Sequence, residues 1–301
     1  MSRRIRLVLA AVVLTIFTSL SATANAQSLT CVEQANETSQ PLRFATAIPV
    51  VSSLLEWLVQ GTSITILYLP PDRYSIKRIS AWLERQAKDT YPFADAVVGI
   101  PSAWSSIDLY PYLRIKNIGV IPIDAARAIL PEGEQVAITP NAEGDPSYFW
   151  LNPANTLLML GIIHRDLVAI IESSCDAKNQ SALVDKTKQN YDMAAQEIRK
   201  LLIDLDSRIS RLDLWQVAVE KPELVDIAQA ALLPVVTIDI AKQSGDPTLL
   251  ITSRKVGHKK LADLPDHILI WYVDDFAKPS KDDLVTRWRY SLSNLTELTT
   301  N

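Results

Sequence analysis

The sequence is poor in the residues from which many catalytic and nucleotide-binding motifs are built. It has eight glycines, three histidines and two cysteines in 301 residues. No GxGxxG, GxxxxGK[ST], GxSxG, HExxH or CxxC motif occurs, which leaves the usual dinucleotide, nucleotide, esterase, zinc-protease and redox sites without their framework. No nucleophile with a neighbouring base is visible. We therefore expect that the protein is not an enzyme.

The histidines are also too scattered to indicate a metal site. His164 lies in an apolar helical stretch, which favours a packed histidine over a ligand or base. His258 lies in a basic loop, and His267 opens a predicted strand. The chain thus lacks a histidine cluster of the kind that binds zinc.

The N-terminus has the pattern of an export signal. Arginines precede an apolar run from Leu7 to about Phe17, and Ala24-Asn25-Ala26 has the small-x-small form of a signal peptidase site. We predict a signal peptide over residues 1–26, and hence a periplasmic protein that does not span the membrane after cleavage. The alternative, a membrane anchor, needs about 20 apolar residues, whereas Thr18 and Ser19 end this run early.

The net charge limits the possible partners of the protein, and the positions of the cysteines indicate their redox state. Loss of the three signal-peptide arginines would take the formal charge from -4 to -7, which argues against a nucleic-acid partner. Cys31 and Cys175 both lie in the predicted exported part, where thiols are usually oxidised. A Cys31–Cys175 disulfide is expected, and two separate free thiols are the alternative.

The N-terminal part alternates strand and helix patterns. Apolar or alternating runs predict strands, and amphipathic runs between them predict helices. The strands are expected at 43–51, 64–69, 96–100 and 118–123, and the helices at 52–60 and 75–88. Strands that are apolar on both faces and alternate with helices indicate a parallel sheet covered on both sides. This predicts an α/β lobe over residues 27–152.

A helical segment follows at residues 153–212. Its first helix, Ala154 to Ser173, is strongly apolar and is expected to be buried. The second, from about Asn179 to Leu212, has neither glycine nor proline and could approach 50 Å at about 1.5 Å per residue. It predicts a rigid strut between two lobes, with a coiled coil as the alternative.

Residues 213–301 repeat the alternating pattern on a smaller scale. Strands are expected at 215–219, 234–240 and 267–273, and helices at 222–233 and 280–293, with an ill-defined stretch between 245 and 265. This predicts a three- or four-stranded second lobe. The predicted fold class is therefore two α/β lobes joined by a long rigid helix, the layout of a periplasmic solute-binding protein of the helical-linker type.

A turn-rich loop carries aromatic residues at the predicted boundary of the first lobe. It runs from Asp145 through Ser147, Tyr148 and Trp150 to Pro153, directly before the apolar helix. Such a loop belongs at a surface or cleft, because its backbone needs polar partners. Asp274-Asp275, the one paired carboxylate singled out as a candidate, follows a predicted strand and is either a cleft feature or a solvated turn.

Two of these segments resemble a known family. The loop DPSYFWLNP from Asp145 to Pro153 resembles the Asp-Pro-His-x-Trp-Leu-Asp-Pro loop of the zinc- and manganese-binding receptors of ABC transporters, the ZnuA-like family. Ile64 to Pro71 resembles the family's strand that ends in Pro-Pro. The likeness covers about residues 42 to 292, and it implies a ligand cleft between the lobes and an ABC transporter permease as partner.

The chain departs from the family at its metal ligands, which are three histidines and a carboxylate. Asp72-Arg73-Tyr74 replaces the first histidine loop, Ser147 or Tyr148 replaces the second histidine, and Glu220 stands where the third is expected. The resemblance thus places Asp72, Tyr74, Ser147, Tyr148, Trp150, Glu220 and Asp275 at the cleft. Asp72 and Glu220 are the candidate ligands for a divalent metal of hard character, although Arg73 and Lys221 could neutralise them instead.

Two hypotheses follow for the function. The first is an exported solute-binding protein that holds a metal ion, a metal chelate or a small organic ligand between its lobes. The second is a degenerate receptor fold that acts as an interaction or accessory protein of the cell envelope, because the core pattern persists while the ligand histidines do not.

Overall fold

The computed structural model describes residues 41–86, 90–129, 132–139, 145–174, 177–254 and 263–297. The predicted signal peptide, Cys31, Cys175 and His258 lie outside the described residues. Export and the disulfide therefore stay predictions.

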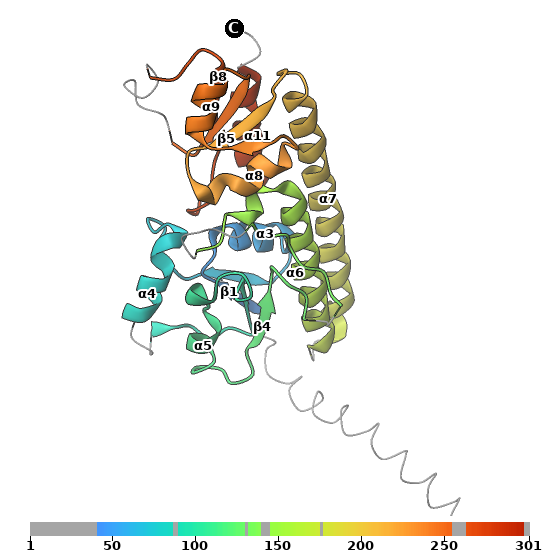
Figure 1. The fold of residues 1–301 in the computed structure, drawn as a ribbon. Helices are drawn as coiled ribbons and strands as arrows, with labels where there is room; N and C mark the ends of the chain where they lie inside the picture. The colour runs from blue at the N-terminus through green and yellow to red at the C-terminus, as the bar shows by residue number, and fades with distance from the viewer. Residues whose placement is uncertain are drawn as a thin grey trace, which may run out of the picture.

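The first lobe is built on a parallel sheet, as predicted. Its order is β2-β1-β3-β4, with Phe44 of the central strand β1 paired to Ile66 and to Ala96. The strands are β1 (Arg43–Thr46), β2 (Thr65–Tyr68), β3 (Ala96–Gly99) and β4 (Ile121–Asp124). This lobe is the lower half of the molecule in Figure 1.

Short helices cover this sheet. They are α3 (Pro49–Leu58), η1 (Ile76–Arg78), α4 (Ile79–Arg85), η3 (Ser105–Ile107) and α5 (Tyr110–Leu113). The strand predicted to reach Val51 ends at Thr46, because Pro49 begins a helix. Proline suits this first helical position, since its fixed φ matches the helix and its missing N–H has no partner to lose.

Two long helices follow, α6 (Pro153–Ser173) and α7 (Ala177–Ile209). Asn152 caps α6, its side-chain oxygen accepting from the N–H of Ala154 at 3.0 Å. Among the described helices, α6 alone is long and apolar enough to cross a membrane. It packs against α7, and half of its most apolar window is buried. His164 of α6 stacks on Tyr191 of α7 at 4.3 Å, as expected for a packed histidine.

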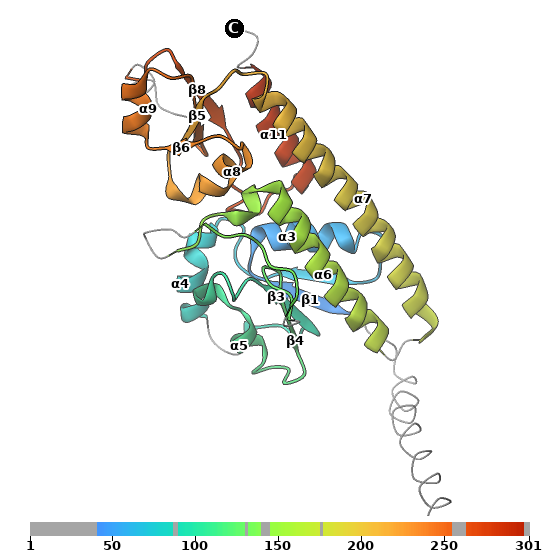
Figure 2. The ribbon, with the colours of Figure 1, turned by 45° about the vertical axis from the view of Figure 1, so that its right-hand side comes forward.

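Helix α7 lies along both lobes (Figure 1, Figure 2). The buried side chain of Asn190 donates to the carbonyls of Leu58 and Gln60 in the first lobe, at 2.9 and 2.8 Å. Arg208 donates to the carbonyl of Leu292 in the second lobe at 3.2 Å. The helix therefore has the position of the predicted strut.

The second lobe repeats the sheet order of the first. Its parallel strands run β6-β5-β7-β8. They are β5 (Gln216–Val219), β6 (Val235–Val236), β7 (Thr248–Thr252) and β8 (Ile268–Tyr272). The helices are η5 (Pro222–Leu224), α8 (Val225–Ala230), α9 (Ile238–Ser244) and α11 (Leu284–Glu297). Two α/β lobes and a long connecting helix confirm the predicted fold class.

The structure corrects two local predictions in this lobe. The ill-defined stretch before Pro265 contains β7, a central strand that is buried at every residue. The strand predicted over 234–240 stops after two residues, since Thr237 caps α9 by accepting from the N–H of Ile240 at 3.3 Å. A cap that satisfies a free backbone N–H favours the helix over continued strand.

Candidate functional site

A cleft of about 870 Å³ lies between the two lobes. Its walls come from the segments that follow β2, β5, β7 and β8, together with the aromatic loop and α11. The lining residues are Arg73, Ser75, Lys77, Arg78, Tyr148, Lys221, Pro222, Glu223, Leu224, Ser253, Arg254, Asp274, Asp275, Ala277, Lys278, Pro279, Ser280 and Arg287.

The sheets explain why these segments meet. In an open parallel sheet, the loops beyond the carboxyl ends of the strands form the ligand crevice. Here β2 of the first lobe and three strands of the second send such loops to one cleft. The volume falls within the range of about 300 to 1,000 Å³ typical of small-molecule sites.

The lining is strongly cationic. Among the described lining residues, seven are arginine or lysine and three are carboxylates, a formal excess of four positive charges. The whole chain has the opposite sign, with a formal charge of -4. The positive charge is therefore concentrated in the cleft.

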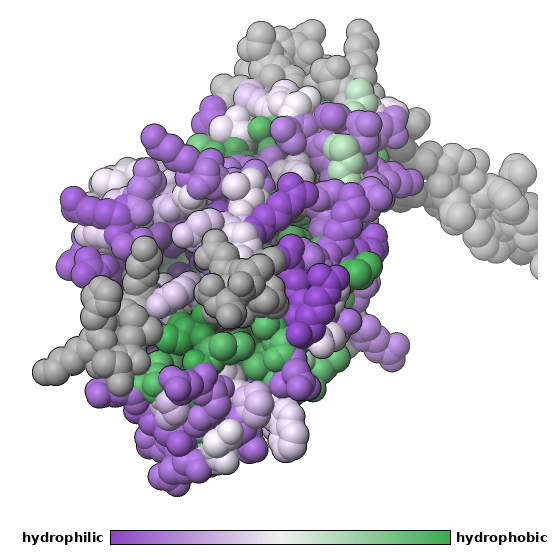
Figure 3. Space-filling view, turned by 90° about the horizontal axis from the view of Figure 1, so that it is seen from above, coloured by the Kyte–Doolittle hydropathy of each residue, from purple (hydrophilic) through white to green (hydrophobic). Residues whose placement is uncertain are grey.

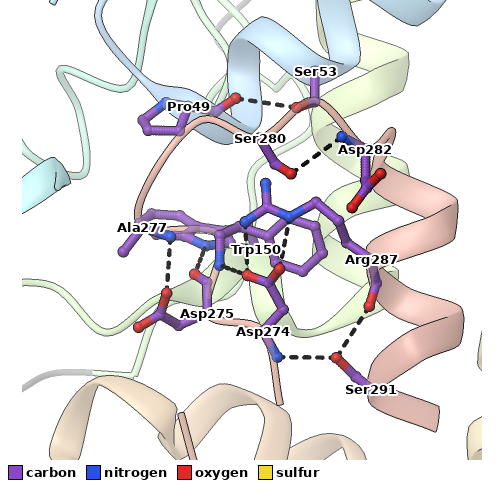
Figure 4. A network of polar contacts seen from close by, with 11 residues as sticks. Pro49, Ser53, Trp150, Asp274, Asp275, Ala277, Ser280, Asp282, Arg287 and Ser291 are labelled. Atoms are coloured by element: carbon purple, nitrogen blue, oxygen red, sulfur yellow. Dashed lines mark hydrogen bonds and ion pairs between the residues drawn. The ribbon is translucent and has the colours of Figure 1, made fainter. Parts of the chain in front are cut away.

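Arg287 of α11 and Asp274 form the central ion pair of the cleft wall (Figure 4). The Nε and Nη2 atoms of Arg287 each donate to the carboxylate of Asp274 at 2.7 Å. The guanidinium also lies over the ring of Phe276, 4.2 Å from its centre. Arg287 is only 6% exposed, and its Nη1 has no hydrogen-bond acceptor among the described residues.

The turn after β8 is held by its own carboxylates. Asp274 accepts from the N–H of Phe276 at 2.8 Å, and Asp275 accepts from the N–H of Ala277 at 3.0 Å. Phe276 has a φ of 52°, in the left-handed region, which costs energy for a residue with a bulky side chain. The turn persists because these two bonds and the burial of the ring fix it.

Polar contacts tie the lobes together beside the cleft. Lys77 of the first lobe forms an ion pair with Glu223 of the second. The N–H of Ile76 donates to the carbonyl of Ala277 at 2.8 Å. Burial alone would raise the pKa of Glu223, but the hydrogen bond and charge of Lys77, with further help from Lys221, hold it below its ordinary value.

The aromatic loop forms part of this junction. Tyr148 stacks on Trp150 with ring centres 4.8 Å apart, and its N–H donates to the carbonyl of Glu223 at 2.8 Å. Burial and the nearby charges of Asp275 and Glu223 raise the pKa of the Tyr148 phenol. The hydroxyl therefore stays protonated and can donate a hydrogen bond.

The residues predicted for the site divide into three groups. Tyr148 and Asp275 line the cleft. Ser147 and Trp150 are buried behind it, where the Ser147 hydroxyl donates to the carbonyl of Thr139 at 3.1 Å and Trp150 Nε1 to that of Asp275 at 3.1 Å.

The third group lies outside the lining of the cleft. Asp72 is exposed, and Tyr74 is half-buried beneath the guanidinium of Arg73, 5.5 Å from the ring centre. Glu220 accepts a hydrogen bond from the hydroxyl of Thr252. The structure thus does not bring Asp72 and Glu220, the candidate metal ligands, together at the cleft.

Sequence reasoning missed the main cationic groups of the second lobe, Arg254, Lys278 and Arg287. Arg254 follows the unrecognised strand β7, so its place at the carboxyl edge of the sheet was hidden. Arg287 lies on a helix, more than ten residues from the turn that it contacts. Lys278 follows Asp274-Asp275 closely, and that proximity was the usable signal.

The described residues do not fit a bare divalent metal. No group of three or more histidine, cysteine, aspartate or glutamate side chains comes together in the part of the chain that the structure describes. The cleft carboxylates are also engaged, Glu223 by Lys77 and Asp274 by Arg287. Zinc and manganese sites need several such donors around one point.

Solved structures with the same architecture include a Zn(II)-bound and a Mn²⁺-bound protein. The structure of ZnuA superposes with a TM-score of 0.56 at 15% identity, over 86% of this chain and 98% of that chain. The Zn(II)-bound ZnuA-like domain of Streptococcus pneumoniae AdcA gives 0.57 at 13% identity, over 87% of this chain and 100% of that one. This chain has the ZnuA-like fold.

A third structure of this fold is the solute-binding protein FpvC from Pseudomonas aeruginosa in complex with Mn²⁺. It superposes with a TM-score of 0.57 at 14% identity, over 86% of this chain and 98% of that chain. No protein-family model matches the sequence, and no curated protein matches it either. The ZnuA-like likeness is thus one of fold.

Proposed function

We propose that this protein is an exported solute-binding protein of an ABC-type uptake system and that it holds its ligand in the interlobe cleft. The observation that carries the proposal is the cleft itself, which lies at the carboxyl ends of parallel strands from both lobes. ZnuA-like receptors of the same fold include proteins solved with zinc or manganese, which supports a role in metal-linked uptake. The permease of the transporter would be its protein partner.

The cleft supports a ligand larger than a single ion. Its volume of about 870 Å³ exceeds what a bare cation needs, and the donors among the described residues do not suit one. Tyr148 and the backbone of the Asp274–Ser280 turn offer both an aromatic surface and polar groups. Such a mixture is typical of sites for small organic molecules.

The proposal is tested by ligand screening on the mature chain. Protein purified from the periplasm is analysed for bound metals and small molecules, and its melting temperature is measured with added divalent metals, metal chelates and organic anions. A specific shift, lost when cleft residues such as Lys221 or Arg254 are replaced, is expected. A protein that binds none of these would contradict the proposal.

An accessory role remains the second candidate, and one observation favours it. The second lobe exposes several large apolar side chains, namely Trp215, Leu232, Val235 and Ile240, which are 64, 84, 40 and 51% exposed. Seen from above, apolar side chains gather between polar ones on the molecular surface (Figure 3). Recovery of an envelope partner, lost on replacing Leu232 and Ile240 by serine, would support this role. Unchanged recovery would contradict it.

A further inference from the structure

We infer that the cleft binds a small organic polyanion, one that carries more than one carboxylate or phosphate group. The inference rests on the proposed function, since it takes the interlobe cleft as the ligand site. It assigns the ligand class from the charge, the hydrogen-bond donors and the size of the cleft.

Five cationic side chains in the lining have no carboxylate partner among the residues that the structure describes. Lys77 and Arg287 are paired with Glu223 and Asp274. The remaining lining cations, which form no ion pair within the described residues, are Arg73, Arg78, Lys221, Arg254 and Lys278. Like charges gathered around one space repel each other, and a bound anion relieves that repulsion.

Arg287 adds a fixed hydrogen-bond donor to these five cations. It is 94% buried, and Nη1 is the one guanidinium nitrogen left without an acceptor in the described structure. Figure 4 shows this nitrogen on the side of the guanidinium away from Asp274, towards Ser280. A buried N–H without an acceptor is costly. An oxygen of a carboxylate or phosphate in the cleft would satisfy it with a charge-assisted hydrogen bond.

The ion pair also orients this donor. Because Asp274 holds Nε and Nη2 in a two-bond fork and Phe276 supports the guanidinium plane, Nη1 cannot turn away. The protonated hydroxyl of Tyr148 supplies a second potential donor in the lining. Fixed donors bind an anion with less loss of conformational freedom than mobile lysines would.

Size favours an organic polyanion over a simple inorganic ion. A single phosphate would leave most of about 870 Å³ unfilled. The five lining cations without a described ion pair come from both lobes. They lie in the segments that follow β2, β5, β7 and β8. An anion with several charged groups could reach more than one of these loops at once.

A metal can still enter as part of such an anion. In a chelate such as iron(III)–citrate, some carboxylate oxygens bind the metal and the others can still accept hydrogen bonds, so part of the recognition chemistry is shared with the free acid. The two sources are separated by titrating the free acid and its metal complex side by side.

The test is isothermal titration calorimetry on the full mature chain. The probes are citrate, iron(III)–citrate, pyrophosphate, inorganic phosphate and Zn²⁺ alone. We expect citrate or iron(III)–citrate to bind more tightly than either inorganic anion. Their affinity should fall as salt rises from 0.05 to 0.5 M, because the Debye length shortens from about 14 to about 4 Å.

Variants locate the binding in the cleft. Arg254→Glu and Lys221→Glu should each lower the affinity for the polyanion about tenfold or more, because each removes one charge-assisted contact and adds charge repulsion. Arg287→Lys keeps the charge but removes the fork, and should weaken binding by a similar factor. Arg114→Glu makes the same charge change on an exposed residue directly after α5, outside the cleft lining, and should leave the affinity unchanged.

The outcomes separate this inference from the proposed function. Binding of a polyanion that the cleft variants weaken and Arg114→Glu does not would support both. Tight binding of Zn²⁺ alone, with no response to any anion, would overturn the inference and leave the receptor function standing. Polyanion binding that the cleft variants do not change would place the site elsewhere and overturn it. Heat from none of the probes would count against both.

Discussion

The two lobes share one strand order and differ in what they present to the cleft. Each is a four-stranded parallel sheet in which the first strand lies second in the sheet. In the first lobe, β1 leads directly into the buried start of α3, and the cations that this lobe adds to the described lining come from the segment after β2. In the second lobe, the loops after β5, β7 and β8 all carry charged lining residues.

This difference shows how one scaffold is divided between stability and binding. In the first lobe, apolar side chains pack around β1 and α3, and Tyr148 of the cleft lining stacks on the buried Trp150. Of the described lining residues, the second lobe supplies all three carboxylates and four of the seven cations. The first lobe is thus the base of the site, and the second carries most of its chemistry.

The largest expected effect is on stability and concerns the aromatic loop of the first lobe. Trp150→Ala removes a side chain that is 1% exposed and its hydrogen bond to Asp275, which should lower the free energy of unfolding by about 3 to 5 kcal/mol. Trp215→Ala, at a site 64% exposed, is the control and should change it by less than about 0.5 kcal/mol. Urea denaturation measures both. Equal losses of stability in the two variants would contradict the placement of Trp150 in the core.

The next effect concerns the ion pair of the second lobe. Arg287→Ala leaves Asp274 without its cation and should cost about 2 to 3 kcal/mol, less than a fully buried pair because Asp274 is 29% exposed. The double variant Arg287→Met with Asp274→Asn should recover part of that loss, since no charge is then unpaired. A double variant as unstable as the sum of the two singles would show that the pair contributes nothing specific.

The contact between the lobes should depend on pH. The folded-state pKa of Glu223 is held below its ordinary value of 4.5, so its stabilisation is present above that value and is lost as the pH falls through the lower folded pKa. Relative to Glu223→Gln, the wild type should be about 1 kcal/mol more stable at pH 7, and the gap should close on acidification. Thermal unfolding at a series of pH values measures it. A gap that widens on acidification would contradict the ion pair with Lys77.

The smallest effects concern the two carboxylates once considered as metal ligands. Glu220→Ala removes one of the two acceptors near the Thr252 hydroxyl, the other being the carbonyl of Arg254, and should cost about 1 kcal/mol or less. Ligand affinity should be unchanged, because Glu220 lies outside the cleft lining. Asp72→Ala, at an exposed residue, should change stability by less than about 0.5 kcal/mol. Calorimetric titration and urea unfolding check both. Loss of ligand binding in either variant would return that residue to the site.

The sequence predicted the scaffold better than the site. Apolar runs such as Ala96 to Gly99 are buried on both faces, so their pattern directly indicates a parallel sheet. The stretch TLLIT of β7 was overlooked because it is short and follows a Gly-Asp-Pro turn without clear periodicity. Arg287 and Asp274 could not be paired from sequence, since only the packing of α11 against the end of β8 brings them together. Local pattern specifies elements, whereas the charge of the cleft emerges from their assembly.

The most direct test of the central claim is the titration of the mature protein with citrate and with Zn²⁺ at low and at high salt. The account predicts heat of binding with citrate that weakens at high salt and is reduced about tenfold in affinity by Arg254→Glu. Binding of Zn²⁺ alone, with no heat from citrate at either salt concentration, would contradict it.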